Sequence, residues 1–417
     1  MTITAEKPTH AYTLDNGLQV ILRQDHRTPG ICASLFHKAG TDHERANQRG
    51  LAYLAGGATF KDKNLERTLG AVANGWIDYH LSAYSLEAPS AELASVLQLL
   101  AARMEPQTLT QERLDKGITH THKLEEGDPY FSSDYWITPS FEELIFPQAR
   151  TVYKFGNIDD LAHIKVADVL SWHEAGYAPN NSILVIAGDT TLDDIQPLVQ
   201  HLFAELAPFE GLAPAEQPAH SFSGDERRLV QHLDTPLPRL QMAFNTPSLA
   251  TPGATGDIRA LQVISALLTK GPQAWLPQRL SEDTHTLTSV ISRLPAYRPN
   301  DDLFLLAATL GADTSLSVQQ VELQIIQLLE SLKTHALDAE TLKYGQQQAL
   351  ESLEEQGTLE IQASILGNLA AIGQPWALID SEAGQIHNVT ADDIQRVANT
   401  YFSPERLSVA HTLPREA

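Results

Sequence analysis

Residues 40–61 read GTDHERANQRGLAYLAGGATFK. The second half of this stretch is informative for what it lacks, since no histidine and no carboxylate occurs between Gly50 and Lys61. Two consecutive glycines stand there instead, Gly56 and Gly57, and each glycine costs a helix interior about 1 kcal/mol relative to alanine. We therefore expect either that a helix breaks here or that another backbone or a ligand approaches the glycines closely.

The length of the chain indicates more than one domain. At 417 residues it exceeds the usual size of a single domain, and a hydrophobic content of 42% supports genuine cores. The stretch from Pro208 to Asp225 is rich in proline and glycine and has no apolar periodicity, which is typical of a linker. We expect an N-terminal domain over residues 1–215 and a C-terminal domain over residues 225–417.

A weak internal repeat suggests that the two domains are similar. In each copy, an aspartate near a helix start is followed by a turn with an aromatic residue and proline, and then by a β-branched strand. The matching pairs, each 224 positions apart, are His163/His387, Ala167/Ala391, Asp168/Asp392, Tyr177/Tyr401 and Val185/Val409. The shared order of helix, turn and strand favours a duplication and predicts two halves of similar structure.

Both halves mix strands with amphipathic helices. The first half opens with a hairpin pattern, in which residues 15–17 (Asp-Asn-Gly) separate two apolar runs, and continues with expected helices over 91–104 and 110–125. The second half has an expected strand over 303–308, followed by a helix with its apolar residues on one face. We predict an α+β fold with two similar domains, each a mostly antiparallel sheet packed with helices.

Composition excludes several classes of function. The formal net charge of −23 argues against nucleic-acid binding; it suits basic peptides as ligands or, more simply, a solvated acidic surface. Cys32 is the only cysteine, which excludes an intramolecular disulfide and multi-cysteine zinc sites, and we expect it to be a small buried apolar residue. No apolar run reaches the roughly 18 residues of a membrane helix. Because residues 1–10 are polar, we expect a cytoplasmic protein, or a periplasmic one if a signal peptide has been removed.

Several motifs, taken in order, resemble those of the pitrilysin/insulinase zinc peptidases, the inverzincins. Residues 14–18 resemble the opening strand turn of that family, and Gly40-Thr41 with Glu44, followed by residues 50–52, resembles the approach to its zinc-site helix. Further similar motifs occur at residues 177–181, 186–189 and 389–393. The resemblance covers nearly the whole chain, and its length matches the short, two-domain form of the family.

The chain departs from the family at the metal site. Active relatives carry H-x-x-E-H, in which two histidines hold zinc and the glutamate takes a proton from the bound water. The corresponding positions here hold Tyr53, Gly56 and Gly57, and the third ligand position, a glutamate in relatives, corresponds to Thr121 or Leu124, just before Glu125 and Glu126. The resemblance therefore implies a non-catalytic chain with no bound metal and no cofactor.

His120 and His122 form the closest histidine pair and are the one feature that favours an independent, rebuilt hydrolase. Two residues that are two apart on a helix do not face each other, so this pair gives little support for a metal site.

In the short form of the family, two chains form a chamber, and in mixed pairs one subunit carries zinc while the other contributes substrate-binding residues. By this resemblance the chain is the second kind: it pairs with a zinc-bearing homologous subunit and binds peptides, with a homodimer possible in isolation. The family's substrate-facing tyrosine position holds Thr288, so Arg293 and Tyr297 are the candidate substrate-binding residues. The lost tyrosine leaves open an alternative, a structural or assembly protein with no peptide substrate, like the core proteins of respiratory complexes that share this fold.

Overall fold

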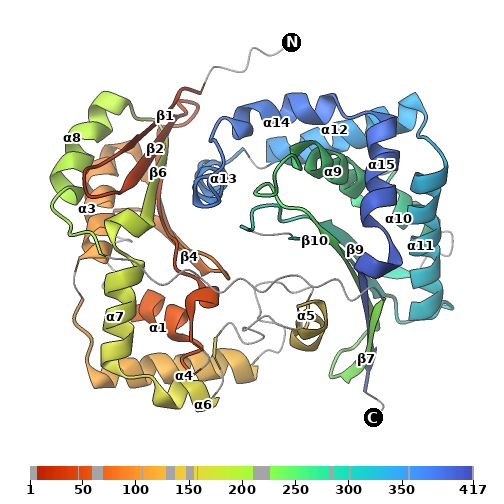
Figure 1. The fold of residues 1–417 in the computed structure, drawn as a ribbon, viewed down its shortest axis with the longest axis horizontal. Coiled ribbons are helices and arrows are strands. Elements are labelled where there is room, and N and C mark those ends of the chain that lie inside the picture. Colours follow the sequence, from red (N-terminus) through yellow and green to blue (C-terminus); the bar gives the residue numbers. More distant parts are fainter. Residues whose placement is uncertain are drawn as a thin grey trace. The chain divides into compact units, whose positions relative to one another are not determined.

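The computed structural model describes residues 7–45, 47–58, 69–105, 107–127, 137–146, 155–156, 158–209, 226–280, 286–299, 302–355 and 357–415. These residues belong to two compact units. The first unit comprises Met1–Phe131, Arg150–Gln217 and Gln356–Trp376, and the second comprises Ser132–Ala149, Pro218–Glu355 and Ala377–Ala417. Each unit is built around one β-sheet (Figure 1).

The first unit contains a six-stranded sheet with the strand order β1-β2-β6-β3-β5-β4. Strands β2 and β6 run parallel, and every other neighbouring pair of this sheet is antiparallel. The expected hairpin is confirmed, since β1 and β2 pair antiparallel on either side of residues 15–17. The strands are β1 (Thr9–Thr13), β2 (Gln19–Gln24), β3 (Gly30–His37), β4 (Val72–Ile77), β5 (Ser82–Pro89) and β6 (Ser182–Gly188).

Helices cover both faces of this sheet. On one face, α3 (Leu93–Met104) and α8 (Leu192–Phe203) pack against alternate strand residues such as Leu22, Leu35 and Leu184. On the other face, α13 (Leu359–Ala371) packs against β3 and β6. Cys32 is fully buried in β3, as expected.

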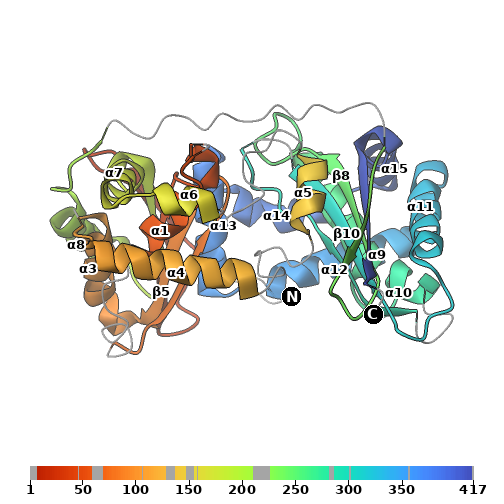
Figure 2. The ribbon, with the colours of Figure 1, turned by 90° about the horizontal axis from the view of Figure 1, so that it is seen from below.

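A smaller layer of helices completes the first unit (Figure 2). It consists of α1 (Leu51–Ala58), α4 (Gln111–Gly127), α6 (Ile158–His163) and α7 (Val166–Gly176). Leu54, Leu114, Leu161 and Trp172 contribute one buried side chain from each of these helices to a common apolar cluster. The layer includes α1, the helix that carries the residues resembling a zinc-site helix.

The second unit contains a five-stranded sheet with the order β7-β11-β8-β10-β9, in which β7 and β11 are parallel and the other pairs are antiparallel. With β1 set aside, this order and these strand directions are the same as in the first sheet. The prediction of two similar, mostly antiparallel halves is therefore confirmed. The strands are β7 (Arg227–Leu233), β8 (Arg239–Thr246), β9 (Leu287–Arg293), β10 (Asp302–Leu310) and β11 (Leu407–Pro414).

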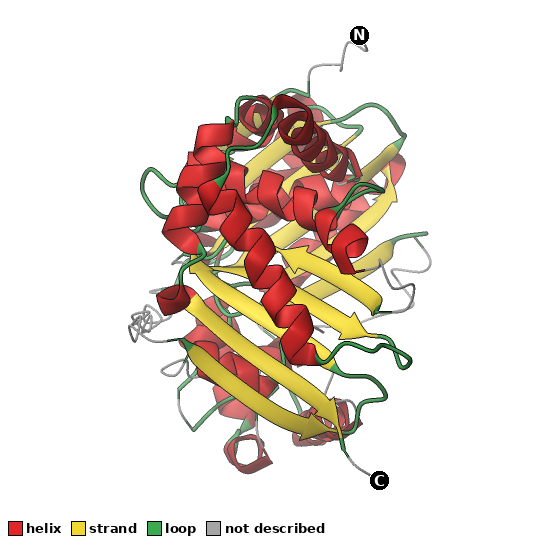
Figure 3. Ribbon diagram, turned by 90° about the vertical axis from the view of Figure 1, so that its right-hand side faces the viewer, coloured by secondary structure: helices red, strands yellow, loops and turns green. Residues whose placement is uncertain are grey.

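Helices again cover both faces, and Figure 3 shows helices in front of the strands on the side toward the viewer. Phe244 and Phe304 on one face contact Phe402, beside α15, while Ala243 and Leu305, their neighbours in sequence, face α5 on the other side. The helices of this unit are α5 (Pro139–Ile145), α9 (Thr255–Thr269), α10 (Trp275–Leu280), α11 (Val318–Thr334), α12 (Ala339–Glu355), α14 (Leu378–His387) and α15 (Ala391–Tyr401). Among the described helices, none is long and apolar enough to cross a membrane.

The internal repeat is real, but its register differs by one residue from the expected one. Helices α7 and α15 begin at Val166 and Ala391, and the strands that follow them begin at Ser182 and Leu407, so equivalent residues lie 225 positions apart rather than 224. The structural partner of Asp168 is thus Asp393, and each accepts a backbone N–H at the start of its helix.

Each sheet receives one covering helix from the opposite half of the sequence. Helix α13 follows the strands of the second sheet β7 to β10 in the chain but packs on the first sheet, and α5 precedes them but packs on the second. The expected domain boundary, between Pro208 and Asp225, falls almost entirely on residues outside the described ranges, and a division at that point stays a prediction.

Helix α13 is held to the first sheet by a buried polar network. The Nε2 amide of Gln362 donates to the carboxylate of Asp25 at 2.9 Å, and its Oε1 accepts from Nε of Arg23 at 3.0 Å. Nε and Nη2 of Arg27 donate to the same carboxylate. Burial opposes ionisation of Asp25, but the hydrogen bonds from Arg27 and Gln362 outweigh it and hold the pKa of this carboxyl well below its usual range.

The close seating of α13 yields a prediction about stability. A Cβ atom at Gly367 would lie 2.3 Å from the ring of Phe36, which is fully buried, so Gly367→Ala should destabilise the protein by about 1–3 kcal/mol through overpacking. Gly384→Ala is the matched control, because a Cβ there meets nothing within 4 Å in α14 and should stabilise by up to about 1 kcal/mol. Chemical denaturation measures both, and equal effects of the two substitutions would contradict the seating described here.

Candidate functional site

The N-terminus of α1 is capped by a buried carboxyl group. Glu44 is 2% exposed, and its two oxygens accept the backbone N–H groups of Gly50 at 3.1 Å and Ala52 at 2.8 Å. Burial raises the pKa of Glu44 to about 8, against the opposing effect of these two hydrogen bonds. The carboxyl therefore fixes the entry of α1 from a distance of six to eight residues in sequence.

Helix α1 runs unbroken through Gly56 and Gly57 to Ala58. A Cβ at Gly56 would meet the side chain of Ile77 at 3.1 Å and the hydroxyl of Tyr177 at 3.6 Å, whereas a Cβ at Gly57 would meet nothing within 4 Å. The expectation of a helix break is thus wrong within the described helix, and so is that of a closely approaching backbone. Side chains rather than backbone approach Gly56, and Gly57 borders open space beside α1.

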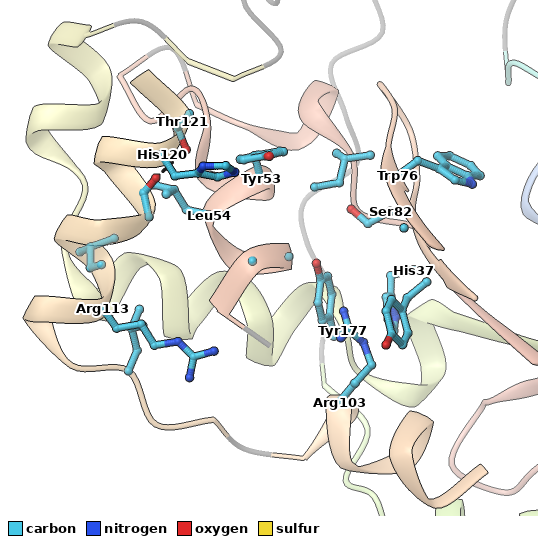
Figure 4. Close-up of a pocket in the computed structure, with 18 of the residues that line it drawn as sticks. His37, Tyr53, Leu54, Trp76, Ser82, Arg103, Arg113, His120, Thr121 and Tyr177 are labelled. Carbon is cyan, nitrogen blue, oxygen red and sulfur yellow. Dashed lines mark hydrogen bonds between the residues drawn. The ribbon is translucent and has the colours of Figure 1, made fainter. Parts of the chain in front are cut away.

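That space is part of a cavity of about 540 Å³ that lies within the first unit. Helices α1 and α4 supply one wall, which includes Tyr53, Arg113 and Thr121, and strands β4 and β5 supply another, which includes Trp76 and Tyr84. In Figure 4, Tyr53, His120 and Thr121 lie together on one side, and His37, Tyr177 and Arg103 lie together on another. The positions of the missing zinc ligands therefore line a cavity rather than a packed core.

The group around His37 is tightly ordered. The His37 ring stacks on the ring of Tyr177 with centroids 4.1 Å apart, and the guanidinium of Arg103 lies over Tyr84 at 3.5 Å from the ring centroid. His173 donates from Nε2 to the carbonyl oxygen of Arg103 at 2.7 Å, which fixes the end of α3. Burial, helped by the charges of Arg103 and His173, holds the pKa of His37 well below its usual range, so its imidazole is neutral.

The hydrogen bonds of His37 define its tautomer. Nδ1 lies 2.7 Å from the hydroxyl oxygen of Ser182, and that hydroxyl donates its own hydrogen to the carbonyl oxygen of Ala178. The Ser182 oxygen must then be the acceptor, so the proton of the neutral ring sits on Nδ1. Nε2 is left as a buried acceptor, with no hydrogen-bond partner among the described residues.

The donor set at the cavity does not fit a zinc ion. Tyr53, Gly56 and Gly57 offer one phenol and no imidazole, and Thr121 directs its hydroxyl to the carbonyl oxygen of Gly117 at 2.9 Å. Across the described ranges, no three His, Cys, Asp or Glu side chains come close enough to share a metal ion. The side chains of Leu124, Glu125 and Glu126 lie outside the described residues.

His120 and His122 both lie on helix α4, where residues two positions apart do not face each other. His120 is exposed and lines the cavity, whereas His122 does not belong to its lining. The structure therefore does not bring the two rings together at this cavity.

The candidate substrate-binding residues belong to the second unit. Arg293 ends β9 and is exposed, and Tyr297 follows in the loop toward β10, half-buried. Ala296, between them, adopts a left-handed conformation with φ of 62°, which is uncommon for a residue with a Cβ. Burial, reinforced by Glu382, raises the pKa of the Tyr297 phenol. A substrate-binding role for either residue stays a prediction.

Sequence reasoning missed the group formed by His37, Arg103 and Tyr177. Tyr177 stood out only as part of the repeat and of the motif at residues 177–181, and no local motif joins three residues from β3, α3 and the turn after α7. Their proximity arises from the sheet order, which no spacing along the chain reveals.

Comparison with known proteins agrees with this architecture. A family model described as the peptidase M16 inactive domain matches residues 163–349. The "Zinc protease PqqE" of Helicobacter pylori is 23% identical, with 98% of this chain and 93% of the relative aligned, and cytochrome b-c1 complex subunit 1 of Rattus norvegicus is 26% identical over 62% of this chain and 55% of its own length.

Solved structures show the same fold over the whole chain. The crystal structure of a protease from Helicobacter pylori has a TM-score of 0.87 at 20% identity and covers 98% of this chain and all of its own. A peptidase M16 inactive-domain structure from Pseudomonas fluorescens has a TM-score of 0.83 at 16% identity, covering 98% of each chain. The full periplasmic protease PqqL of Escherichia coli has a TM-score of 0.79 at 14% identity, and this chain spans 48% of it.

The molecule thus has the two-unit α+β architecture of a zinc-peptidase homologue. Residues 163–349 match the M16 inactive-domain family, and the whole chain is similar to zinc-protease relatives, which is consistent with a pitrilysin/insulinase-type homologue whose α1 lacks the H-x-x-E-H motif.

The cap on α1 predicts a specific pH dependence. Because the pKa of Glu44 is about 8 in the folded chain and about 4.3 in an unfolded one, the folded state holds an extra proton between these values. The stability contributed by this group is fully present below about pH 4.3 and is lost as the pH rises through 8.

Glu44→Gln removes the titration. The difference in unfolding free energy between the natural chain and this variant should therefore decline by a few kcal/mol between pH 5 and pH 8.5, as denaturant titrations at each pH can measure. A difference that is constant or grows with pH would contradict a protonated Glu44.

Proposed function

We propose that this chain is a non-catalytic peptidase subunit, which pairs with a zinc-bearing homologue to form a peptide-binding chamber. The observation that carries the proposal is the cavity beside α1: the scaffold of a zinc site is kept and capped by Glu44, while its ligand positions hold Tyr53, Gly56 and Gly57. A scaffold without ligands suits a subunit that relies on its partner for the chemistry.

The side chains that remain at the cavity support an inactive role. Hydrolysis without a metal needs a nucleophile activated by an adjacent base. Ser82 and Ser182 lie opposite His37 on the two neighbouring strands, but Ser82 donates to the carbonyl oxygen of Ala39 and Ser182 to that of Ala178. Both are therefore committed to the backbone, and Nδ1 of His37 is a donor toward Ser182 rather than a base.

A second candidate function is a structural subunit with no peptide substrate. It is favoured by the relative in the rat, which is named a subunit of the cytochrome b-c1 complex. The two functions differ in what they require of Arg293 and Tyr297, since only the peptide-binding chamber uses them.

The first experiment mixes the chain with its zinc-bearing partner, obtained by co-purification, and measures hydrolysis of a peptide library. Hydrolysis should exceed that of the partner alone, and Arg293→Ala with Tyr297→Ala should raise KM without preventing assembly. As the matched control, Arg279→Ala removes another cation of the same unit. A complex that forms but leaves hydrolysis unchanged would point to the structural role.

Metal content gives an independent prediction. The natural chain, dialysed against zinc, should retain far less than one ion per chain, because three protein ligands are the minimum of a zinc site. Tyr53→His with Gly57→His and Thr121→Glu supplies those ligands on the same two helices and should bind about one zinc per chain. The control carries Thr121→Gln in place of Thr121→Glu, and one zinc per natural chain would overturn the proposal.

The cellular compartment of the chain is a separate question. The location in the cytoplasm stays a prediction, and the relative from Escherichia coli is described as periplasmic. Fractionation of the host cells with an antibody to the chain distinguishes the two.

A further inference from the structure

The two units differ at one edge of their sheets. In the first unit, β1 pairs antiparallel with β2 and covers the outer edge of that strand. The equivalent of β2 in the second unit is β7, because each runs parallel to the strand that follows the repeated helix, β6 in one unit and β11 in the other. No described strand pairs with the outer edge of β7. The second sheet therefore has an open strand where the first sheet is closed by an antiparallel one.

The repeat also shows which side chain this difference leaves uncovered. Leu22 in β2 lies opposite Ile186, and Val230 in β7 lies opposite His411. Since Ile186 and His411 are 225 positions apart, Val230 is the equivalent of Leu22. Leu22 is fully buried beneath α3 and α8, whereas Val230 is 58% exposed. An apolar side chain thus stands in solvent at the middle of an open strand.

Strand β7 lacks most of the features that blunt an exposed edge, such as a bulge, a proline or a very short strand. All seven of its residues pair with β11 without a register shift, and none is proline or glycine. The charges that it carries are engaged within the unit. Arg227 donates to Oδ1 of Asn245 at 2.8 Å, and Arg228 donates to the carboxylate of Glu322. The edge is therefore long, regular and able to pair with a further strand.

The first sheet shows that an antiparallel strand completes such an edge, and the sequence of β7 suits pairing with itself. Antiparallel pairing about a twofold axis at Gln231 places Leu229 opposite Leu233 of the second copy, an apolar pair on one face. On the other face, the exposed Val230 gains a neighbouring strand that covers it. Both partners in this arrangement use the same residues, as a twofold interface requires.

Charge selects this axis over the neighbouring one. A twofold axis at Val230 would place Glu226 opposite Asp234 of the second copy, and like charges directly opposite each other destabilise a strand pair. With the axis at Gln231, Asp234 lies opposite Arg228, which is a pair of opposite charge. The basic start of the strand thus meets the acidic residue that follows its end.

We propose that β7 is the surface on which two copies of this chain associate, by antiparallel pairing of their β7 strands about a twofold axis at Gln231. The two five-stranded sheets then form one continuous sheet, and association stops at the dimer because a twofold interface is closed. Strand β7 belongs to the second unit, whereas the cavity beside α1 lies in the first. The inference does not depend on the proposed function, and it assigns an interface to the homodimer that the sequence leaves possible.

Sedimentation velocity of the purified full chain tests the association. The natural chain should sediment as a dimer at micromolar concentration. Val230→Lys should raise the dissociation constant about tenfold or more, since a lysine on an edge strand opposes the addition of another strand. Val72→Lys is the matched control, because Val72 is also an exposed valine on an edge strand, β4 of the first sheet, and should leave the dimer intact. A monomeric natural chain, or a dimer indifferent to Val230→Lys, would overturn the proposal.

An introduced cysteine tests the axis. Cys32, the one natural cysteine, is buried and should form no link between chains. Gln231→Cys brings two thiols opposite each other and should give a covalent dimer on oxidation. Leu229→Cys should give far less, because its counterpart in the second copy is Leu233. Thermal unfolding confirms that each variant is folded. Equal cross-linking by the two variants, or none by Gln231→Cys, would overturn the pairing about this axis.

Discussion

A β-sheet with two apolar faces must be covered on both, and this requirement shapes the whole chain. The first sheet is covered by α3 and α8 on one face and by α13 on the other, and α13 comes from the second half of the sequence. The second sheet depends in the same way on α5 from the first half. The polar network of Asp25 and Gln362 and the close approach of Gly367 to Phe36 make the seat of α13 specific as well as apolar.

Apolar packing and helix capping also explain how α1 can keep its place without zinc ligands. Helix α1 is kept in place by the cap from Glu44 and by the apolar cluster that it shares with α4 and α7, and neither depends on a metal ion. The helix therefore forms although Gly56 and Gly57 stand at two of the positions that resemble ligand positions. What remains is a cavity beside α1 whose lining includes Tyr53, Gly56 and Gly57.

Sequence patterns predicted the elements well where local chemistry determines them. The turn at residues 15–17, the helices near 91–104 and 110–125 and the strand at 303–308 all occur, because turn residues and apolar periodicity act over short distances. The repeat was recognised but shifted by one residue, since Asp168 was matched with Asp392 and not with Asp393, its counterpart at the start of α15. The crossing of α5 and α13 and the meeting of His37 with Tyr177 arise from long-range packing, which leaves no mark in local spacing. The expected helix break at the glycine pair was wrong, and the pair lines a cavity whose other walls come from segments far apart in the chain, so local spacing could not reveal it.

The central claim is that this chain functions as the zinc-free member of a mixed pair. The most direct measurement is the intact native mass of the tagged chain recovered from the cells that produce it. The account predicts a complex with a second chain of similar size whose sequence contains H-x-x-E-H and which carries zinc. Recovery of the chain only as a monomer or homodimer would contradict it.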